Sequence, residues 1–307
     1  MSPSVMDLNL GALEIGTLIS SVLFGVTTVQ VYMYWNRRFN DRVAIQGLVA
    51  TVWTCEAVHT AFLWIYLYHL TVTFYGVPAK LAESHWTLNM SGFFDGFIGA
   101  VVQSYFAYRV LIVSGKWPIS LISWTGSLLQ CTGTFAVTAL GFLTTLEQFA
   151  EKYGWLVKGV LVLDVIVDII NTTALCYYLS KGRTGFHSTD RMIDTIILWT
   201  VETGLLTTIA ALTMLIFDIS LGTTAMWIGV SLFYAKLYSN SLLAALNGRD
   251  ILRGKGVSTF DTTSAGTRRL EISVVREREM EMGVLPNSAY GKENSVDTKP
   301  VEYSPRF

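Results

Sequence analysis

Charged residues are scarce in this chain. Only 15% of its 307 residues are Asp, Glu, Lys or Arg, whereas 51% are hydrophobic, and a typical soluble domain carries roughly 25% charged residues. The charges that do occur crowd into the segment after residue 248 and into a few short loops. This partition argues against an ordinary soluble core and indicates a polytopic membrane protein.

The chain also lacks an excess of either charge, a disulfide pattern and any catalytic motif. Its net charge is −1 and its pI is about 6.4, so we expect no nucleic-acid partner. The three cysteines lie in apolar segments and reveal no redox compartment. No G-x-S-x-G elbow, nucleotide loop or hydrolase triad is present, so no enzyme class is predicted.

Hydrophobic segments near or above the length of about 20 residues that crosses a bilayer occur seven times. We predict an all-α fold, a seven-transmembrane-helix bundle that forms one membrane domain over residues 1–247. The remaining residues, 248–307, are polar and rich in Ser and Thr, which predicts a disordered C-terminal tail. The seven predicted spans are residues 11–34, 44–69, 92–113, 118–145, 155–179, 193–217 and 222–246.

Basic residues are shared unequally between the two sides of this predicted bundle. Eleven lie in the first, third and fifth loops, at the adjoining span ends or after the last span, against three on the other side. The positive-inside rule therefore predicts the N-terminus outside and the C-terminus in the cytosol. The opening "MSPSVMDLNL" has no basic region, so no removable signal peptide is expected. Membrane lipids are the expected partners, and the tail or the 180–194 loop could bind a cytosolic protein.

Several polar side chains fall in the middle of the predicted spans, where such groups are costly and mark candidate functional sites. Glu56 and His59 are three residues apart and share one helix face. Asp164, Asp168 and Asn171 also keep helical spacing. The candidate intramembrane polar site contains eight residues, which are Glu56, His59, Asp164, Asp168, Asn171, Glu202, Lys236 and Asn240.

This set contains more acids than bases. Four carboxyl groups face one ammonium and one imidazole, so some carboxyls are expected to be protonated or to face a water-filled cavity. Such a cavity suits cation or proton binding, whereas the alternative is a polar network that only fixes helix register. Lys236 lies roughly 15 Å from the cytosolic end near Asn247, beyond the reach of its stem. We expect it to pair with Glu56, Asp168 or Glu202.

Three known classes of seven-span membrane protein share some of these features. A lysine in the seventh helix is typical of retinal proteins, but Leu232 stands one turn before Lys236 and the third span offers only the peripheral Asp95. G-protein-coupled receptors share the topology, yet the third span matches their acidic-Arg-Tyr signature only at Arg109. A zinc hydrolase needs several deep histidines, and only His59 is deep. No cofactor, metal or catalytic residue is predicted.

Two long stretches carry a family resemblance, "KGRTGFHSTDRMIDTIILWTVETGLLTTIAAL" and "FYAKLYSNSLLAALNGR". Together with "GALEIGTLISSVLFGVTTVQVYMY", they resemble an uncharacterised family of fungal, mainly basidiomycete, multi-pass membrane proteins with a C-terminal domain of unknown function. The resemblance is strongest over residues 160–250 and implies no activity. It implies that Lys236, Tyr238, Asn240 and Ser241 belong to the family motif. The resemblance also implies a neutral amide in many relatives where Glu202 stands, which disfavours Glu202 as the partner of the lysine.

The sequence as a whole favours an integral membrane protein, in the plasma membrane or an endomembrane, that is receptor-like or binds a small solute in a polar intramembrane cavity. A proton- or cation-coupled transporter and a structural membrane protein stay open as alternatives. Common secondary transporters are less favoured, because the chain shows neither an inverted repeat nor paired Gly/Pro-broken helices.

Overall fold

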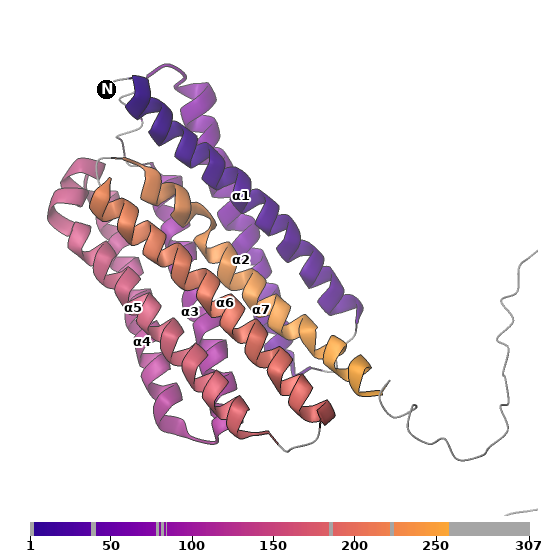
Figure 1. Cartoon of the computed structure of the whole chain (residues 1–307). Coiled ribbons are helices and arrows are strands. Elements are labelled where there is room, and N and C mark those ends of the chain that lie inside the picture. The colour runs from indigo at the N-terminus through magenta and orange to yellow at the C-terminus, as the bar shows by residue number, and fades with distance from the viewer. Residues whose placement is uncertain are drawn as a thin grey trace, which may run out of the picture. The chain divides into compact units, whose positions relative to one another are not determined.

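Long helices make up nearly all of the described chain (Figure 1). The computed structural model describes residues 3–37, 41–77, 80, 83, 85–183, 187–221 and 224–257. The described residues contain no strand, which confirms the predicted all-α class. In chain order the elements are α1 (Pro3–Asn36), α2 (Val43–Tyr68), the π-helical turn η1 (His69–Thr73), α3 (Trp86–Ser114), α4 (Trp117–Leu143), α5 (Leu146–Lys181), α6 (His187–Ser220) and α7 (Met226–Val257).

Local sequence explains where several of these helices begin and end. Pro118 occupies the first turn of α4, where its missing N–H costs no hydrogen bond. The side chain of Thr145 caps α5 by accepting a hydrogen bond from the backbone N–H of Gln148. Gly115 ends α3 in the left-handed conformation, with φ of 65°, which a residue without Cβ adopts at little cost.

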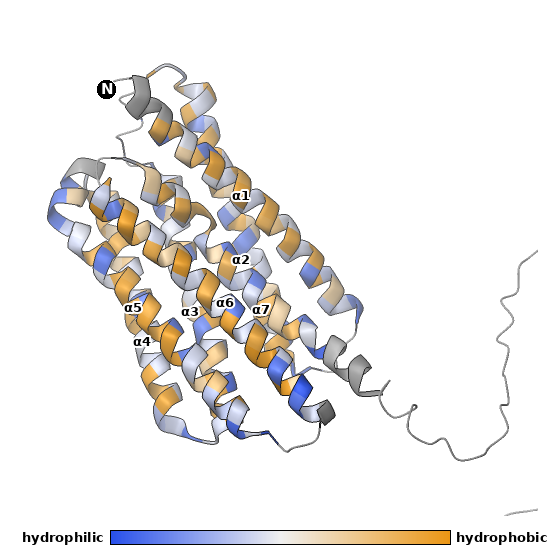
Figure 2. Cartoon of the chain, in the orientation of Figure 1, coloured by the Kyte–Doolittle hydropathy of each residue, from blue (hydrophilic) through white to orange (hydrophobic). Residues whose placement is uncertain are grey.

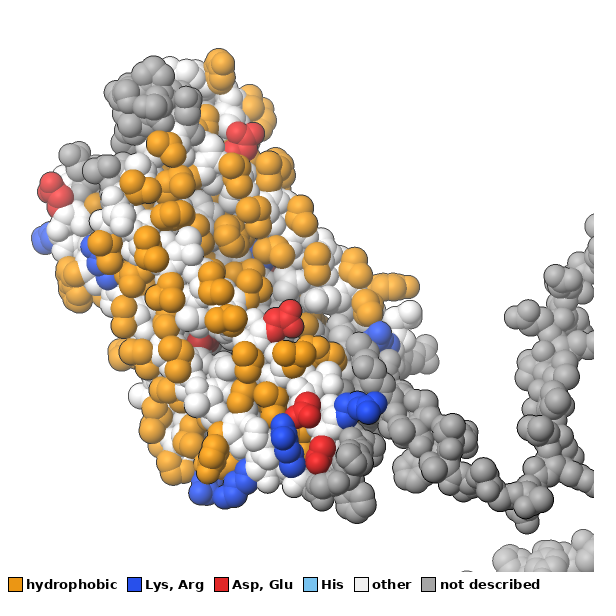
Figure 3. All heavy atoms as spheres, viewed as in Figure 1, with side chains coloured by type: hydrophobic (Ala, Val, Ile, Leu, Met, Phe, Trp, Pro, Cys, Tyr) orange, Lys and Arg blue, Asp and Glu red, His pale blue; other side chains and the backbone are white. Residues whose placement is uncertain are grey.

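Six of the described helices are long and apolar enough to cross a bilayer. Large apolar side chains stand exposed on their outer faces, and they cover much of the visible surface over α5 and α6 (Figure 3). Hydrophobic residues predominate along the middle of these helices (Figure 2). An apolar surface of this extent would be unstable in water. The chain is therefore a multi-pass membrane protein. The six segments are Leu8–Asn36, Val43–Thr73, Trp86–Ser114, Trp117–Leu143, Gln148–Lys181 and Thr189–Ser220.

Seven apolar spans were predicted, but α7 is not among the six helices that are long and apolar enough to cross a bilayer. It contacts α1, α2, α3 and α6, and no side chain from Met226 to Leu243 is exposed. A helix that other helices largely enclose has little surface left for lipid along these turns, so its side chains need not be apolar. This burial explains how α7 accommodates Lys236 and Asn240.

The contact between α1 and α7 is close enough to bring the two backbones together. A Cβ atom added at Gly16 would overlap the carbonyl oxygen of Gly229, and one added at Gly229 would lie 2.6 Å from the carbonyl oxygen of Ala12. Small residues at such positions let membrane helices gain van der Waals contact that bulkier side chains would prevent. The glycine pair therefore fixes α7 against α1.

The boundary of the predicted tail also changes. Residues 248–257 belong to α7 rather than to a disordered segment, because "GRDILRGKGV" contains no proline that would stop the helix. The rest of the predicted tail, from residue 258, lies outside the described residues.

Candidate functional site

Lys236 lies at the centre of a buried polar cluster between α7 and α2. Its ammonium forms an ion pair with the Glu56 carboxylate, and both side chains are 0% exposed. The same ammonium donates to the Glu56 carbonyl oxygen at 3.1 Å and to the Thr60 hydroxyl at 2.9 Å. Ser239 donates to the second carboxylate oxygen of Glu56. The structure thus pairs Lys236 with one of the three partners that the sequence suggests.

His59 extends this cluster towards α3. Its Nδ1 atom lies 3.1 Å from Lys236 Nζ, and its Nε2 atom lies 3.5 Å from Asp95 Oδ1. An ammonium group has hydrogens but no acceptor, so Nδ1 must accept and the ring hydrogen must sit on Nε2, facing Asp95. A line of polar groups results, and Asp95, with its side chain 16% exposed, is its least buried member. We call Glu56, His59, Thr60, Asp95, Lys236 and Ser239 the lysine cluster.

A second cluster gathers around two carboxyl groups on α5. Asp164 and Asp168 are one turn apart, and the amide nitrogen of Gln103 donates to both, at 2.8 Å and 3.1 Å. The Tyr238 hydroxyl lies 2.9 Å from Asp164 Oδ2 and 2.7 Å from Asp168 Oδ2. Helices α3, α5, α6 and α7 all contribute side chains. We call Gln103, Asp164, Asp168, Thr207, Tyr234 and Tyr238 the aspartate cluster.

The aspartate cluster has fewer hydroxyl hydrogens than contacts between oxygen atoms. Tyr238 contacts both carboxyls and lies 3.2 Å from the Tyr234 hydroxyl, Tyr234 contacts Asp164, and Thr207 lies 2.7 Å from Asp168. These are five contacts, whereas three hydroxyl groups supply only three hydrogens. If both carboxyls were ionised, two of the five contacts would have no hydrogen between the oxygen atoms, and lone pairs would face each other there. A proton on the carboxyl pair supplies a further donor.

No counter-charge from the described residues meets this pair. None of their ion pairs includes Asp164 or Asp168. A cavity of about 20 Å³ lies beside Asp168 and is lined by residues that include Asn171 and Tyr238. A cavity of this size holds about one water molecule. Asn171 accepts a hydrogen bond from Ser123 at 2.6 Å, but its buried Nδ2 has no partner within the described part of the chain.

The two clusters lie on opposite sides of α7. Tyr234 and Tyr238 are one turn apart, and Lys236 stands between them in sequence, about 200° around the helix axis from Tyr234. The predicted single site therefore resolves into two, because the polar residues of α7 face different neighbours. The lysine cluster contains Glu56, His59 and Lys236, whereas the aspartate cluster contains Asp164 and Asp168 and has Asn171 beside it.

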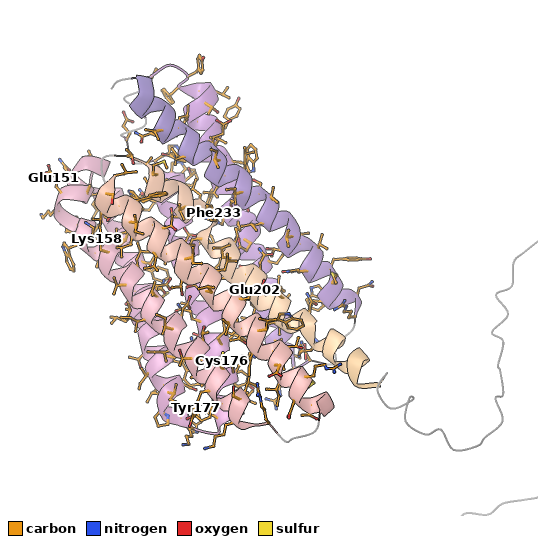
Figure 4. The ribbon with its side chains drawn as sticks, in the orientation of Figure 1. Glu151, Lys158, Cys176, Tyr177, Glu202 and Phe233 are labelled. Carbon is orange, nitrogen blue, oxygen red and sulfur yellow. The ribbon has the colours of Figure 1, made fainter. Side chains whose placement is uncertain are left out.

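Two residues of the predicted set lie outside both clusters. Glu202 is exposed on α6 (Figure 4), so it pairs with neither the lysine nor the aspartates. Asn240 donates to the carbonyl oxygens of Leu23, at 3.2 Å, and of Lys236, at 2.7 Å. Its amide therefore ties α7 to the backbone of α1.

Several site residues escaped the sequence reasoning because they are uncharged. Hydroxyl and amide side chains scarcely interrupt an apolar segment, so a search for charges at membrane depth overlooks them. The spacing of Tyr234 and Tyr238, one turn apart on either side of Lys236, was the available signal. The overlooked residues are Thr60, Gln103, Thr207, Tyr234 and Ser239.

The class that fold and site define is a multi-pass helical membrane protein with a buried polar centre. Within it, residues 164–251 match the model of a family of unknown function, DUF6534. The match runs from Asp164 through α6 and most of α7, so it includes Lys236, Tyr234 and Tyr238, and it bears out the predicted domain of unknown function. The match says nothing of a fungal origin. No curated protein and no solved structure matches the chain.

Proposed function

We propose that this chain is a proton-coupled membrane protein that holds an exchangeable proton on the Asp164–Asp168 pair. The observation that carries the proposal is the shared Tyr238 hydroxyl, whose single hydrogen cannot serve both carboxyls. Two buried carboxyls without a counter-cation cannot both ionise at low cost, so one proton stays bound between them. In this proposal α7 is the seventh span and the basic helix ends face the cytosol.

The size of the neighbouring cavity favours a proton over an organic solute. Pockets for small molecules have volumes of about 300–1,000 Å³, whereas the cavity beside Asp168 measures about 20 Å³. A receptor-like role, or the binding of a small solute at this site, would need the helices to separate. Proton binding needs no such opening.

The unpartnered amide atoms favour a working site over a structural network. Asn171 Nδ2 and Gln103 Oε1 are buried and lack partners among the described residues. A network that only fixes helix register is expected to satisfy its polar atoms, because each unsatisfied one costs free energy. Asn171 lines the small cavity, so its open hydrogen-bonding position suits a water molecule that exchanges protons with the carboxyl pair.

Infrared difference spectroscopy tests for the bound proton directly. The purified protein, stepped from acidic to alkaline pH, should lose the carbonyl stretch of a protonated carboxyl group, and this change should vanish in both Asp164→Asn and Asp168→Asn. Glu83→Gln is the matched control, because Glu83 lies between α2 and α3, outside the six apolar segments, with its side chain 59% exposed, and its loss should leave the band unchanged. A band that survives both aspartate variants contradicts proton binding at this pair.

Flux into liposomes tests the coupling separately. Reconstituted protein should carry protons down an imposed gradient, and Asp168→Asn should reduce the rate, while Glu83→Gln should not. If the infrared band is present but flux does not exceed that of empty liposomes, the proton is bound without being transported, and the transport part of the proposal fails.

A further inference from the structure

A larger hollow lies on the side of the bundle, between α2, α3 and α4. It has a volume of about 760 Å³, within the range of about 300–1,000 Å³ typical of ligand pockets. Its walls are mostly apolar and aromatic. Because the surrounding helices present their outer faces to the bilayer, membrane lipid has direct access to this groove. Lining residues include Ile45, Leu48, Phe97, Val101, Trp124 and Leu128.

One end of the groove carries positive charge. Arg42, which precedes α2, lines the groove together with Tyr105 of α3. Arg109 lies one turn beyond Tyr105 on the same face of α3 and interacts electrostatically with it. Among the described residues, neither Arg42 nor Arg109 forms an ion pair with a carboxylate. Arg42 lines the groove and is exposed, whereas Arg109 is only partly exposed and is not a lining residue, so Arg42 is the arginine that an anion from outside the chain reaches first.

The neighbouring carboxylate is already engaged by another arginine. Asp41 accepts two hydrogen bonds from the Arg249 guanidinium, at 2.9 Å and 2.7 Å, and one from the Tyr34 hydroxyl at 2.8 Å. This paired geometry is the strongest that an arginine and a carboxylate adopt. Asp41 therefore neutralises Arg249, and the positive charge of Arg42 and Arg109 is left over.

We propose that the groove binds an anionic phospholipid. Its acyl chain lies against the apolar walls, and its phosphate headgroup meets Arg42, while Arg109, one turn beyond Tyr105, adds to the positive charge at this end. Basic pockets between membrane helices on the cytosolic side are suited to anionic headgroups. A sterol would fill the apolar part of the groove but would leave both arginines without an anion. The charge at the end of the groove therefore selects a phospholipid.

Native mass spectrometry of the full chain in detergent tests this site. Dioleoylphosphatidylserine should stay bound more strongly than dioleoylphosphatidylcholine. Replacing Arg42 or Arg109 with glutamine should weaken phosphatidylserine binding about fivefold for each arginine, since each contact near an anionic surface contributes roughly that factor. Arg191→Gln is the matched control, because Arg191 is an exposed arginine at the start of α6 and outside the groove.

The apolar part of the groove needs a variant of its own. Ala44 lines the groove and is exposed, so Ala44→Trp should fill the space without disturbing the core and should reduce phosphatidylserine binding with all arginines present. Equal binding of the two lipids, or equal losses in Arg42→Gln and Arg191→Gln, overturns the proposal. Because Arg42 is exposed, Arg42→Gln carries this test even if Arg109→Gln does not fold.

Discussion

Replacing Lys236 with methionine is expected to destabilise the helix bundle by about 3–5 kcal/mol, the usual cost of leaving one member of a buried ion pair alone. Methionine keeps the length of the lysine stem but removes the charge. Glu56 would lose its only cationic contact among the described residues and would keep Ser239 as a side-chain donor. The unfolded state within a membrane also finds partners for polar groups, which favours the lower end of this range.

The double variant Lys236→Met, Glu56→Met separates the ion pair from simple packing. With both charges absent, no buried charge is left unpaired, and apolar side chains often replace such a pair at little or no cost. The double variant should therefore be much more stable than Lys236→Met. Stability is measured by titration with sodium dodecyl sulfate in mixed micelles, followed by far-ultraviolet circular dichroism.

The pair formed by Lys158 and Asp218 is a control on the same protein. Their charged atoms are 3.4 Å apart, but the side chains are 44% and 15% exposed. Since water screens an exposed pair, the coupling energy there should stay below about 1 kcal/mol. If Lys236→Met costs no more than Lys158→Met, or if the losses at Lys236 and Glu56 simply add, the two residues do not depend on each other.

Two further predictions concern helix contacts and pH. Gly16→Ala should destabilise the bundle by about 1–3 kcal/mol in the same titration, since the new methyl group meets the backbone of Gly229. Gly11→Ala is the control and should leave stability unchanged, because no atom lies within 4 Å of its new Cβ. Burial lowers the pKa of His85, which accepts hydrogen bonds from Thr87 through Nδ1 at the start of α3. As pH falls, His85 is therefore protonated in the unfolded chain before it is protonated in the folded one, so the melting temperature should fall below about pH 6.5. If His85→Gln leaves this pH dependence unchanged, His85 is not its cause.

Six of the helices were predictable because each contains an apolar segment of bilayer length. The ends of the helices were less predictable, since a helix continues past the hydrocarbon region wherever the sequence permits it. α5 begins at Leu146, ahead of the predicted start at residue 155, because Thr145 caps it there. α7 continues to Val257, where the change in composition had indicated a tail.

The candidate site was only partly predictable, because helical spacing shows which residues share a face but not which neighbour that face meets. Glu56 and His59 share a face and do meet Lys236. Glu202 lies at similar depth, yet the rotation of α6 turns it outward. Likewise, only the packed structure shows that Gln103, an isolated amide in α3, joins the two aspartates of α5.

If α7 is the seventh span, as proposed above, its burial has a consequence for biosynthesis. A lysine at the centre of a membrane helix costs about 2.5–3.5 kcal/mol on scales of insertion by the translocon, and α7 has too few apolar residues to offset this cost as readily as the other helices do. The helices that surround it, α1, α2, α3 and α6, are all synthesised earlier. Because Glu56 is then already in the bilayer, α7 can enter it as a partner of finished helices. Its membrane insertion and its folding become a single step, and substitutions at Glu56 should lower the yield of inserted α7.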